Sequence, residues 1–302
     1  MTKIYIDGSA GTTGLRIHDR LKDRPELEIL SLPEELRKNN AARKEIINEA
    51  DIAFFCLPDP AAVEAAEMTG ESTCVIDTST AHRTADGWTY GFPELKGQRE
   101  KIQNSNRIAN PGCHASGFIS LVEPLVREKL ISPDTALTCF SITGYSGGGR
   151  KMIEEYESAG RDKALQAPRQ YALGQSHKHL KEMQMLCRLS TAPVFCPIVA
   201  DYYSGMAVTV SLFRRNLRGT AEDLKALYRE TYYSRIVHFE EDLDGMIPGN
   251  LFADRDDMAI GVAGNEERIL LLSVFDNLGK GAAIQNMNLL LGLEETTGLV
   301  LQ

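Results

Sequence analysis

The stretch that decides the fold is KIYIDGSAGTTG at residues 3–14. Residues 3–7 predict a β-strand, and the apolar spacing of residues 13–22 predicts a helix directly after the turn. Glycine permits a tight turn with close approach of the backbone, and a helix N-terminus presents N–H groups to a pyrophosphate. The G-x-x-G-x-x-G turn therefore predicts a dinucleotide site. Its expected residues are Gly8, Ser9, Gly11, Thr12, Thr13 and Gly14.

Strands and helices continue to alternate up to about residue 110. Further strands are expected at 27–32, 52–57 and 73–77, with helices at 43–49 and 60–68. Residues 52–57 form a nearly continuous apolar run, as in a strand buried on both faces. This order predicts a doubly wound parallel sheet, which with the glycine turn is an α/β Rossmann-type fold.

The second half of the chain has a different pattern. Residues 206–213 and 268–275 alternate in polarity and predict longer strands, with a helix at 221–232 between them. Such strands are typical of a mixed sheet covered by helices on one face, so we expect a second, α+β domain beginning near Cys113. Residues 281–292 predict a packed helix that returns to the first domain.

Composition excludes several classes of protein. The chain has 302 residues, 43% of them hydrophobic, and a net charge of −9, which is typical of a soluble globular protein of two domains. The negative charge argues against nucleic-acid binding, since phosphate contacts need clustered Lys and Arg. No apolar run approaches the roughly 18 residues of a membrane span. The N-terminus reads as a strand without an apolar leader, so we expect a cytoplasmic protein.

One of the six cysteines stands apart from the others. Most lie in apolar, strand-like runs and are expected to be small buried side chains. Cys113 instead lies in NPGCHASGF at 110–118, directly before an amphipathic helix. The dipole and unpaired N–H groups of a helix N-terminus favour a thiolate. Cys113 is therefore the predicted nucleophile.

A nucleophilic thiolate also needs a partner that handles protons, and histidine is the usual one. The sequence GQSHKH at 174–179 offers His177 and His179 at the start of a predicted helix. A pair of metal ligands is the alternative, but no clear third ligand accompanies them, so no metal is expected. A further possibility is that the two histidines are simply exposed at the start of the helix. His177 and His179 both remain candidates for the acid–base group, with a slight preference for His179 because it opens the helix.

The choice of cofactor is predicted from the end of the second strand. An acidic residue usually binds the free ribose hydroxyl there, but this chain has Ser31-Leu-Pro33, followed by Arg37 and Lys38. The missing carboxylate and the nearby cations favour NADP. A second glycine cluster, TGYSGGGR at 143–150, permits approach to a flat ring or an anion. Together with Cys113, these features indicate redox chemistry on an aldehyde or an acyl phosphate.

Motifs along most of the chain resemble the N-acetyl-gamma-glutamyl-phosphate reductases in their short, type 2 form. They are GSAGTTG at 8–14, DTSTAHR at 77–83, YGFPEL at 90–95, ANPGC at 109–113, SGGGR at 146–150, HKH at 177–179 and DNLGKGAA at 276–283. A more distant resemblance is to the aspartate-semialdehyde dehydrogenases. The chain departs from the family at His114, where long forms often have Tyr, and at Gly148, where many have Ala.

The resemblance implies a Rossmann domain formed by 1–112 and 279–302, and a substrate-binding and dimerisation domain at 113–278. It implies NADPH-dependent reduction of N-acetyl-glutamyl phosphate to the semialdehyde, with release of phosphate, by a homo-oligomer (a dimer or a tetramer). Cys113 would be the nucleophile, with the base at His177 or His179. Arg83 matches a phosphate-contacting position in the semialdehyde dehydrogenases, and the positions near the nicotinamide are Ser146, Gly147 and Asn277.

Two other functions fit the same sequence features. The first is reduction of aspartyl phosphate or another amino-acid acyl phosphate, since motif spacing does not define the substrate pocket. The second is a dinucleotide-sensing regulator that has kept the glycine turn and lost catalysis.

Overall fold

The structure is a computed structural model that describes residues 1–243, 245–278 and 281–301. The chain divides into two compact units, one of Met1–Pro111 with Ala282–Leu299 and one of Gly112–Gly281 with Val300–Gln302. Gly279 and Lys280 lie outside the described residues, as do Asp244 and Gln302. The motif at 276–283 and the start of the predicted segment 279–302 therefore fall partly outside them.

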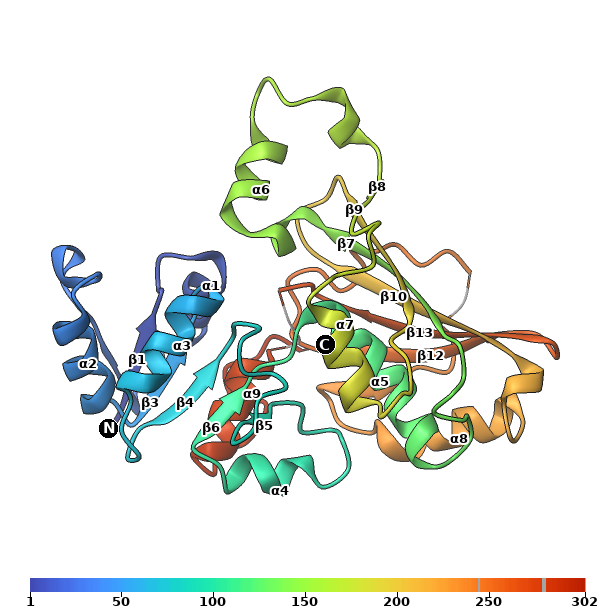
Figure 1. Ribbon diagram of the computed structural model, residues 1–302, viewed down its shortest axis with the longest axis horizontal. Helices are drawn as coiled ribbons and strands as arrows, with labels where there is room; N and C mark the ends of the chain where they lie inside the picture. The colour runs from blue at the N-terminus through green and yellow to red at the C-terminus, as the bar shows by residue number, and fades with distance from the viewer. Residues whose placement is uncertain (244, 279–280, 302) are drawn as a thin grey trace. The chain divides into compact units, whose positions relative to one another are not determined.

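The first unit is a parallel sheet with helices, and its described strands are ordered β2-β1-β3-β4-β6-β5 (Figure 1). The strands are β1 Thr2–Asp7, β2 Leu27–Leu30, β3 Ile52–Phe55, β4 Cys74–Asp77, β5 Thr89–Tyr90 and β6 Arg107–Ala109. The helices are α1 Thr12–Leu21, α2 Asn40–Glu49, α3 Asp59–Met68, α4 Gln98–Gln103 and α9 Ala282–Leu290. Every pairing is parallel, which confirms the predicted doubly wound sheet.

Apolar clusters cover both faces of this sheet. All four residues of β3 are buried, which explains its continuous apolar sequence. On one face Ile4 and Phe54 pack with Met287 of α9, so the last helix of the chain belongs to the first core. On the other face Ala53 packs with Ile47 of α2. The unit therefore has the two-sided core that helices on both faces of a parallel sheet require.

The glycine turn lies where the strand order reverses, because β1 is flanked by β2 on one side and β3 on the other. Gly8 has a φ of +87°, and a Cβ there would overlap the carbonyl oxygen of Cys56, just after β3. A Cβ on Gly14 would overlap the carbonyl oxygen of Gly8. Gly8 and Gly14 are therefore required by the close packing of β1, β3 and α1. Gly11, the N-cap of α1, has an ordinary φ of −82° and is exposed.

The second unit contains a mixed sheet, whose described strands are ordered β11-β12-β13-β10-β7-β9-β8. The strands are β7 Thr138–Gly144, β8 Arg169–Gln170, β9 Val194–Ala200, β10 Met206–Phe213, β11 Val237–Phe239, β12 Met258–Gly264 and β13 Arg268–Phe275. The helices are α5 Cys113–Arg127, α6 Gly149–Glu157, α7 His179–Leu186 and α8 Ala221–Thr231. The strands predicted at 206–213 and 268–275 have the expected bounds and pair directly, antiparallel. The predicted α+β class is confirmed.

The two faces of this sheet differ. Helix α5 packs on β10 and β13 and is flanked by α7 and α8, so these three helices lie on one face (Figure 1). Alternate side chains of the central strands point to the opposite face. Large apolar side chains remain exposed there: Phe140, Val194, Phe213 and Leu270, with 46%, 55%, 52% and 39% exposure. We call these four residues the open sheet face.

Within residues 1–243, 245–278 and 281–301, no helix combines the length and the apolar character needed to cross a lipid bilayer.

We expect Gly14→Ala to destabilise the first unit by about 1–3 kcal/mol, because the added methyl group overlaps backbone that cannot move aside. Urea unfolding can be followed by the fluorescence of Trp88, the single tryptophan, which packs in this unit. Gly11→Ala is the matched control and should change the free energy of unfolding by only about 0.5 kcal/mol. Equal effects of the two substitutions would contradict the assignment of Gly14 to close packing.

Candidate active site

The site in the second unit is built around the first residue of α5. Cys113 opens this 15-residue helix, after the N-cap Gly112. The N–H of Gly112 donates to Glu182 Oε1 at 2.8 Å, and the Glu182 side chain is buried in α7. Cys113 itself is partly exposed and forms no disulfide bond. The fold thus places an accessible sulfur at a helix N-terminus, where the helix dipole favours its anionic form.

Three histidine rings cluster at the start of α5 and α7. His114, the next residue of α5, lies 5.7 Å from His177 and 5.5 Å from His179, measured between ring centroids. The rings of His177 and His179 are 4.7 Å apart, and Phe195 of β9 packs against His114 and His177 at 5.2 and 5.1 Å. The structure therefore brings both predicted acid–base candidates to the residue that follows the predicted nucleophile.

The two candidate histidines differ in their surroundings. His177 is partly exposed, and its Nδ1 accepts the backbone N–H of His179 at 3.2 Å, at the start of α7. Burial, and then the charge of Lys178, lower the pKa of His177. His177 is therefore neutral near pH 7, and because Nδ1 accepts, its proton is on Nε2. His179 is 5% exposed and is the first residue of α7. Both imidazoles are fixed by the start of the same helix.

The neighbours of His114 were not found by the sequence motifs. Its Nδ1 lies 2.6 Å from Ser141 Oγ on β7, and its Nε2 lies 2.8 Å from the hydroxyl oxygen of Tyr171. Burial, with a smaller contribution from His177, lowers the pKa of His114 to about 3. Ser141, Tyr171 and Glu182 are thus site residues that sequence reasoning missed. The one available signal was the departure from the family at His114.

The second glycine cluster is linked by hydrogen bonds to Asn277, which follows β13. Asn277 Nδ2 donates to Ser146 Oγ at 3.1 Å, and the N–H of Gly205 donates to Asn277 Oδ1 at 2.8 Å. Ser146 and Asn277 are buried, whereas Gly147 is exposed. A Cβ on Gly147 would lie 2.8 Å from Asn277 Nδ2. The structure thus brings the three predicted nicotinamide-side residues together, with an exposed backbone segment beside them.

The glycine turn of the first unit opens on a cavity of about 670 Å³. Gly8 and Ser9 line it at the end of β1, and Arg37 and Lys38 line it beyond β2. Gly11 is the N-cap of α1, and Thr12, Thr13 and Gly14 form its first turn. Two exposed cations and a glycine turn at a helix N-terminus fit the phosphates of a dinucleotide. Six of the predicted cofactor residues therefore belong to one turn, and Arg37 faces the same cavity.

A buried ion pair in this cavity was not predicted. Arg43 Nη2 lies 2.8 Å from Asp7 Oδ2, and both side chains are almost completely buried. Arg43 also approaches Glu64 at 3.5 Å. The charge of Arg43 is therefore balanced by carboxylates of the protein. The cations on the cavity rim that lack such a buried partner among the described residues are Arg37 and Lys38.

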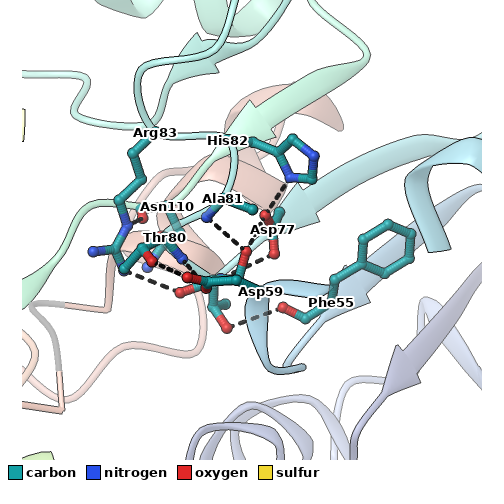
Figure 2. Close-up of polar contacts among 10 residues, drawn as sticks. Phe55, Asp59, Asp77, Thr80, Ala81, His82, Arg83 and Asn110 are labelled. Atoms are coloured by element: carbon teal, nitrogen blue, oxygen red, sulfur yellow. Dashed lines mark hydrogen bonds and ion pairs between the residues drawn. The ribbon is translucent and has the colours of Figure 1, made fainter. Parts of the chain in front are cut away.

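Arg83 is held in the loop that follows β4. Its Nε donates to the carbonyl oxygen of Asn110 at 2.9 Å, and its Nη2 donates to that of Thr78 at 3.0 Å (Figure 2). The loop is fixed by Asp77, which accepts from Ser79 and pairs with His82 Nδ1 at 2.6 Å. These contacts orient a guanidinium group beside the Asn110 carbonyl, shortly before Cys113 in the sequence.

Comparisons with known protein families agree with this architecture. Residues 31–105 match the NAD-binding domain of semialdehyde dehydrogenases, and residues 113–277 match their dimerisation domain. Among solved structures, aspartate semialdehyde dehydrogenase II from Vibrio cholerae has a TM-score of 0.71 at 17% identity, covering 96% of this chain and 98% of its own. The Candida albicans enzyme, solved with NADP, has a TM-score of 0.66 at 16% identity, covering 95% and 98%. These structures share the fold.

Relatives with higher sequence identity are named as reductases. A protein from Chelativorans sp. named N-acetyl-gamma-glutamyl-phosphate reductase is 43% identical, covering 96% of this chain and 98% of its own length. A Pseudomonas putida protein named N-acetyl-gamma-glutamyl-phosphate reductase 2 is also 43% identical, covering 98% of each chain. With both semialdehyde dehydrogenase domains present and such identity over nearly the whole length, the chain belongs to the N-acetyl-gamma-glutamyl-phosphate reductase family.

Proposed function

We propose that this protein catalyses the NADPH-dependent reduction of N-acetyl-L-glutamyl 5-phosphate to N-acetyl-L-glutamate 5-semialdehyde and phosphate. The observation that carries the proposal is an accessible thiol at the N-terminus of α5, beside clustered histidines, in a chain 43% identical to reductases of that name. A thiolate is the group that converts an acyl phosphate into an acyl-enzyme ready for reduction.

Cys113 acts as the nucleophile. Its sulfur attacks the acyl carbon, a C–S bond forms, and the C–O bond to phosphate breaks through a tetrahedral oxyanion. The first-turn N–H groups of α5 and the helix dipole stabilise that negative charge. The Gly112–Glu182 hydrogen bond fixes the residue directly before the nucleophile, so the sulfur is held in place. The product of this step is a thioester on Cys113.

One of the paired histidines handles the proton of the second step. Bound NADPH supplies a hydride to the thioester carbonyl carbon. His177 or His179 then protonates the resulting oxygen, and takes the proton back when the C–S bond breaks and the semialdehyde leaves. His179 is the preferred group, because its side chain is buried and it opens α7, whereas Nδ1 of His177 is occupied by a backbone N–H.

The remaining predicted residues bind the two ligands. Arg83, oriented by Thr78 and Asn110, attracts the departing phosphate through the positive charge of its guanidinium group. Gly8, Ser9, Gly11, Thr12, Thr13 and Gly14 take the pyrophosphate of the cofactor, and Ser146, Gly147 and Asn277 take its nicotinamide side. The cofactor is NADP rather than NAD, because Arg37 lies on the cavity rim. The location is cytoplasmic, since none of the six cysteines forms a disulfide bond.

A coupled assay tests the reaction and the nucleophile together. We expect the wild-type protein to oxidise NADPH with N-acetyl-glutamyl phosphate and to do so far more slowly with aspartyl phosphate. Cys113→Ser should abolish turnover, because a serine hydroxyl is a much weaker nucleophile, while NADPH binding measured by calorimetry persists. Cys187→Ser, which removes a buried thiol from the same unit, is the control. Turnover by Cys113→Ser would refute the role of the sulfur.

The cofactor preference is tested at Arg37. We expect Arg37→Ala to weaken NADPH binding about 10-fold, since a charge-assisted hydrogen bond to the 2′-phosphate is lost, and to leave NADH binding unchanged. Arg218→Ala, an exposed cation of the second unit, should alter neither affinity. Tighter binding of NADH than NADPH by the wild type would exclude the NADP assignment.

We also propose that a second copy of the chain covers the open sheet face. Several large apolar side chains are exposed on one face of this sheet, and these strands belong to the segment that matches a dimerisation domain. The resulting assembly is a dimer or a tetramer.

Sedimentation velocity tests this assembly. We expect Phe140→Glu to convert the oligomer to monomers at micromolar concentration, because a charge is then buried without a partner. Val63→Glu, on an exposed position of α3 in the first unit, should leave the sedimentation coefficient of the oligomer unchanged. An oligomer that survives Phe140→Glu would place the interface elsewhere.

A further inference from the structure

The contacts of His114 carry an inference beyond the reaction itself. His114 is 4% exposed and each ring nitrogen has a hydroxyl partner, Ser141 on one side and Tyr171 on the other. A neutral imidazole has one donor and one acceptor nitrogen. The surroundings of the two hydroxyl groups decide which nitrogen carries the proton.

Ser141 fixes the arrangement on its side. Its side chain is fully buried, and its hydroxyl has one hydrogen-bond partner in the part of the chain that the structure describes, Nδ1 of His114. A buried hydroxyl proton without an acceptor costs about 1–3 kcal/mol. Ser141 therefore donates its proton to Nδ1, and Nδ1 is the acceptor nitrogen of His114.

The proton of His114 is then on Nε2. Burial keeps the ring neutral, since the pKa of His114 is lowered to about 3. Nε2–H accordingly donates to the hydroxyl oxygen of Tyr171, 2.8 Å away. This leaves the phenolic proton of Tyr171 pointing away from the imidazole. The two hydrogen bonds thus point the same way, from Ser141 to His114 and from His114 to Tyr171. The last group, the hydroxyl of Tyr171, keeps a proton that it can donate.

The donor end of this hydrogen-bond chain lies among the histidines at the start of α5 and α7. Tyr171 as a residue is only partly buried. The ring of Tyr171 lies 6.0 Å from that of His177, measured between ring centroids, and its hydroxyl group contacts His114, the residue that follows Cys113. Burial raises the pKa of Tyr171, and the charge of Cys113 raises it further. Tyr171 therefore stays protonated near neutral pH. Its proton has no other acceptor within residues 1–243, 245–278 and 281–301.

We propose that Tyr171 donates a hydrogen bond to the oxygen of the acyl group carried by Cys113, and that His114 is the positioning residue that fixes this donor. The proposal rests on the proposed function of Cys113. Tyr171 forms no covalent bond and keeps its proton, while the proton that neutralises the oxyanion still comes from His177 or His179. The phenol adds a side-chain donor to the N–H groups of the α5 N-terminus, where charge develops on the substrate oxygen.

The first test determines which ring nitrogen of His114 carries the proton, and needs no substrate. A long-range ¹H–¹⁵N spectrum of protein labelled in its histidine rings distinguishes an acceptor ring nitrogen from a donor one. The His114 signals are identified by their loss in His114→Phe. We expect Nδ1 to be the unprotonated nitrogen and Nε2 the protonated one. The opposite tautomer would require Tyr171 to donate to His114, and would overturn the proposal.

The second test is kinetic. Tyr171→Phe should lower kcat about 100-fold and leave KM for the acyl phosphate within about twofold, as for loss of a donor used in the transition state. Tyr228→Phe removes a different buried phenol, which donates to the carbonyl oxygen of Leu121, and should leave kcat unchanged. An unchanged kcat in Tyr171→Phe, or a raised KM with kcat intact, would overturn the proposal.

A double-substitution cycle tests the positioning role. Because His114 is proposed to act through Tyr171, His114→Phe should lower kcat, and adding Tyr171→Phe should lower it little further. If the fold loss in kcat of the double variant equals the product of the two single losses, His114 does not act through the phenol. The proposed function fails in a different way, namely if the wild-type protein does not reduce the acyl phosphate at all. The tautomer measurement would still stand in that case.

Discussion

The N-terminus of α5 is the constraint on which the second unit depends. This helix is buried along most of its length, with β10 and β13 beneath it and α7 and α8 beside it, so its axis cannot shift without disturbing the whole core. Its first turn is tied to α7 by the hydrogen bond from Gly112 to Glu182. Because α7 also begins with His179, one packed helix pair sets the positions of both the sulfur and the imidazoles. The reactive groups are therefore placed by the most rigid part of the unit.

Much of the fold could be predicted, because its strongest signals are local. The apolar run at 52–57 and the alternation at 206–213 and 268–275 each reflect burial that a single strand experiences, and the structure has strands at all three. The glycine turn was recognisable for the same reason. The bounds of β2 and β3 were predicted too long, since a periodic pattern does not show where a strand leaves its neighbour.

The candidate site was predictable where a motif carries the chemistry, and not where residues meet only after folding. Cys113 and the histidine pair stand out within a few positions of sequence. Tyr171 lies just after the short edge strand β8 and Ser141 lies within β7, and nothing in their neighbouring residues links them to His114. The Arg43–Asp7 pair is equally non-local. Such contacts depend on sheet register and helix placement, which the sequence pattern leaves undetermined.

Asn277 has a mechanical consequence for one end of the central strands of the mixed sheet. Its amide contacts Gly144 at the end of β7, Ser146 in the next turn and Gly205 before β10. One side chain thus joins the ends of three adjacent strands, β13, β10 and β7. The three connections must then move as a block. A planar ring that binds at this end of the strands meets backbone that is already ordered. Little conformational entropy of the chain is therefore lost when the ring binds.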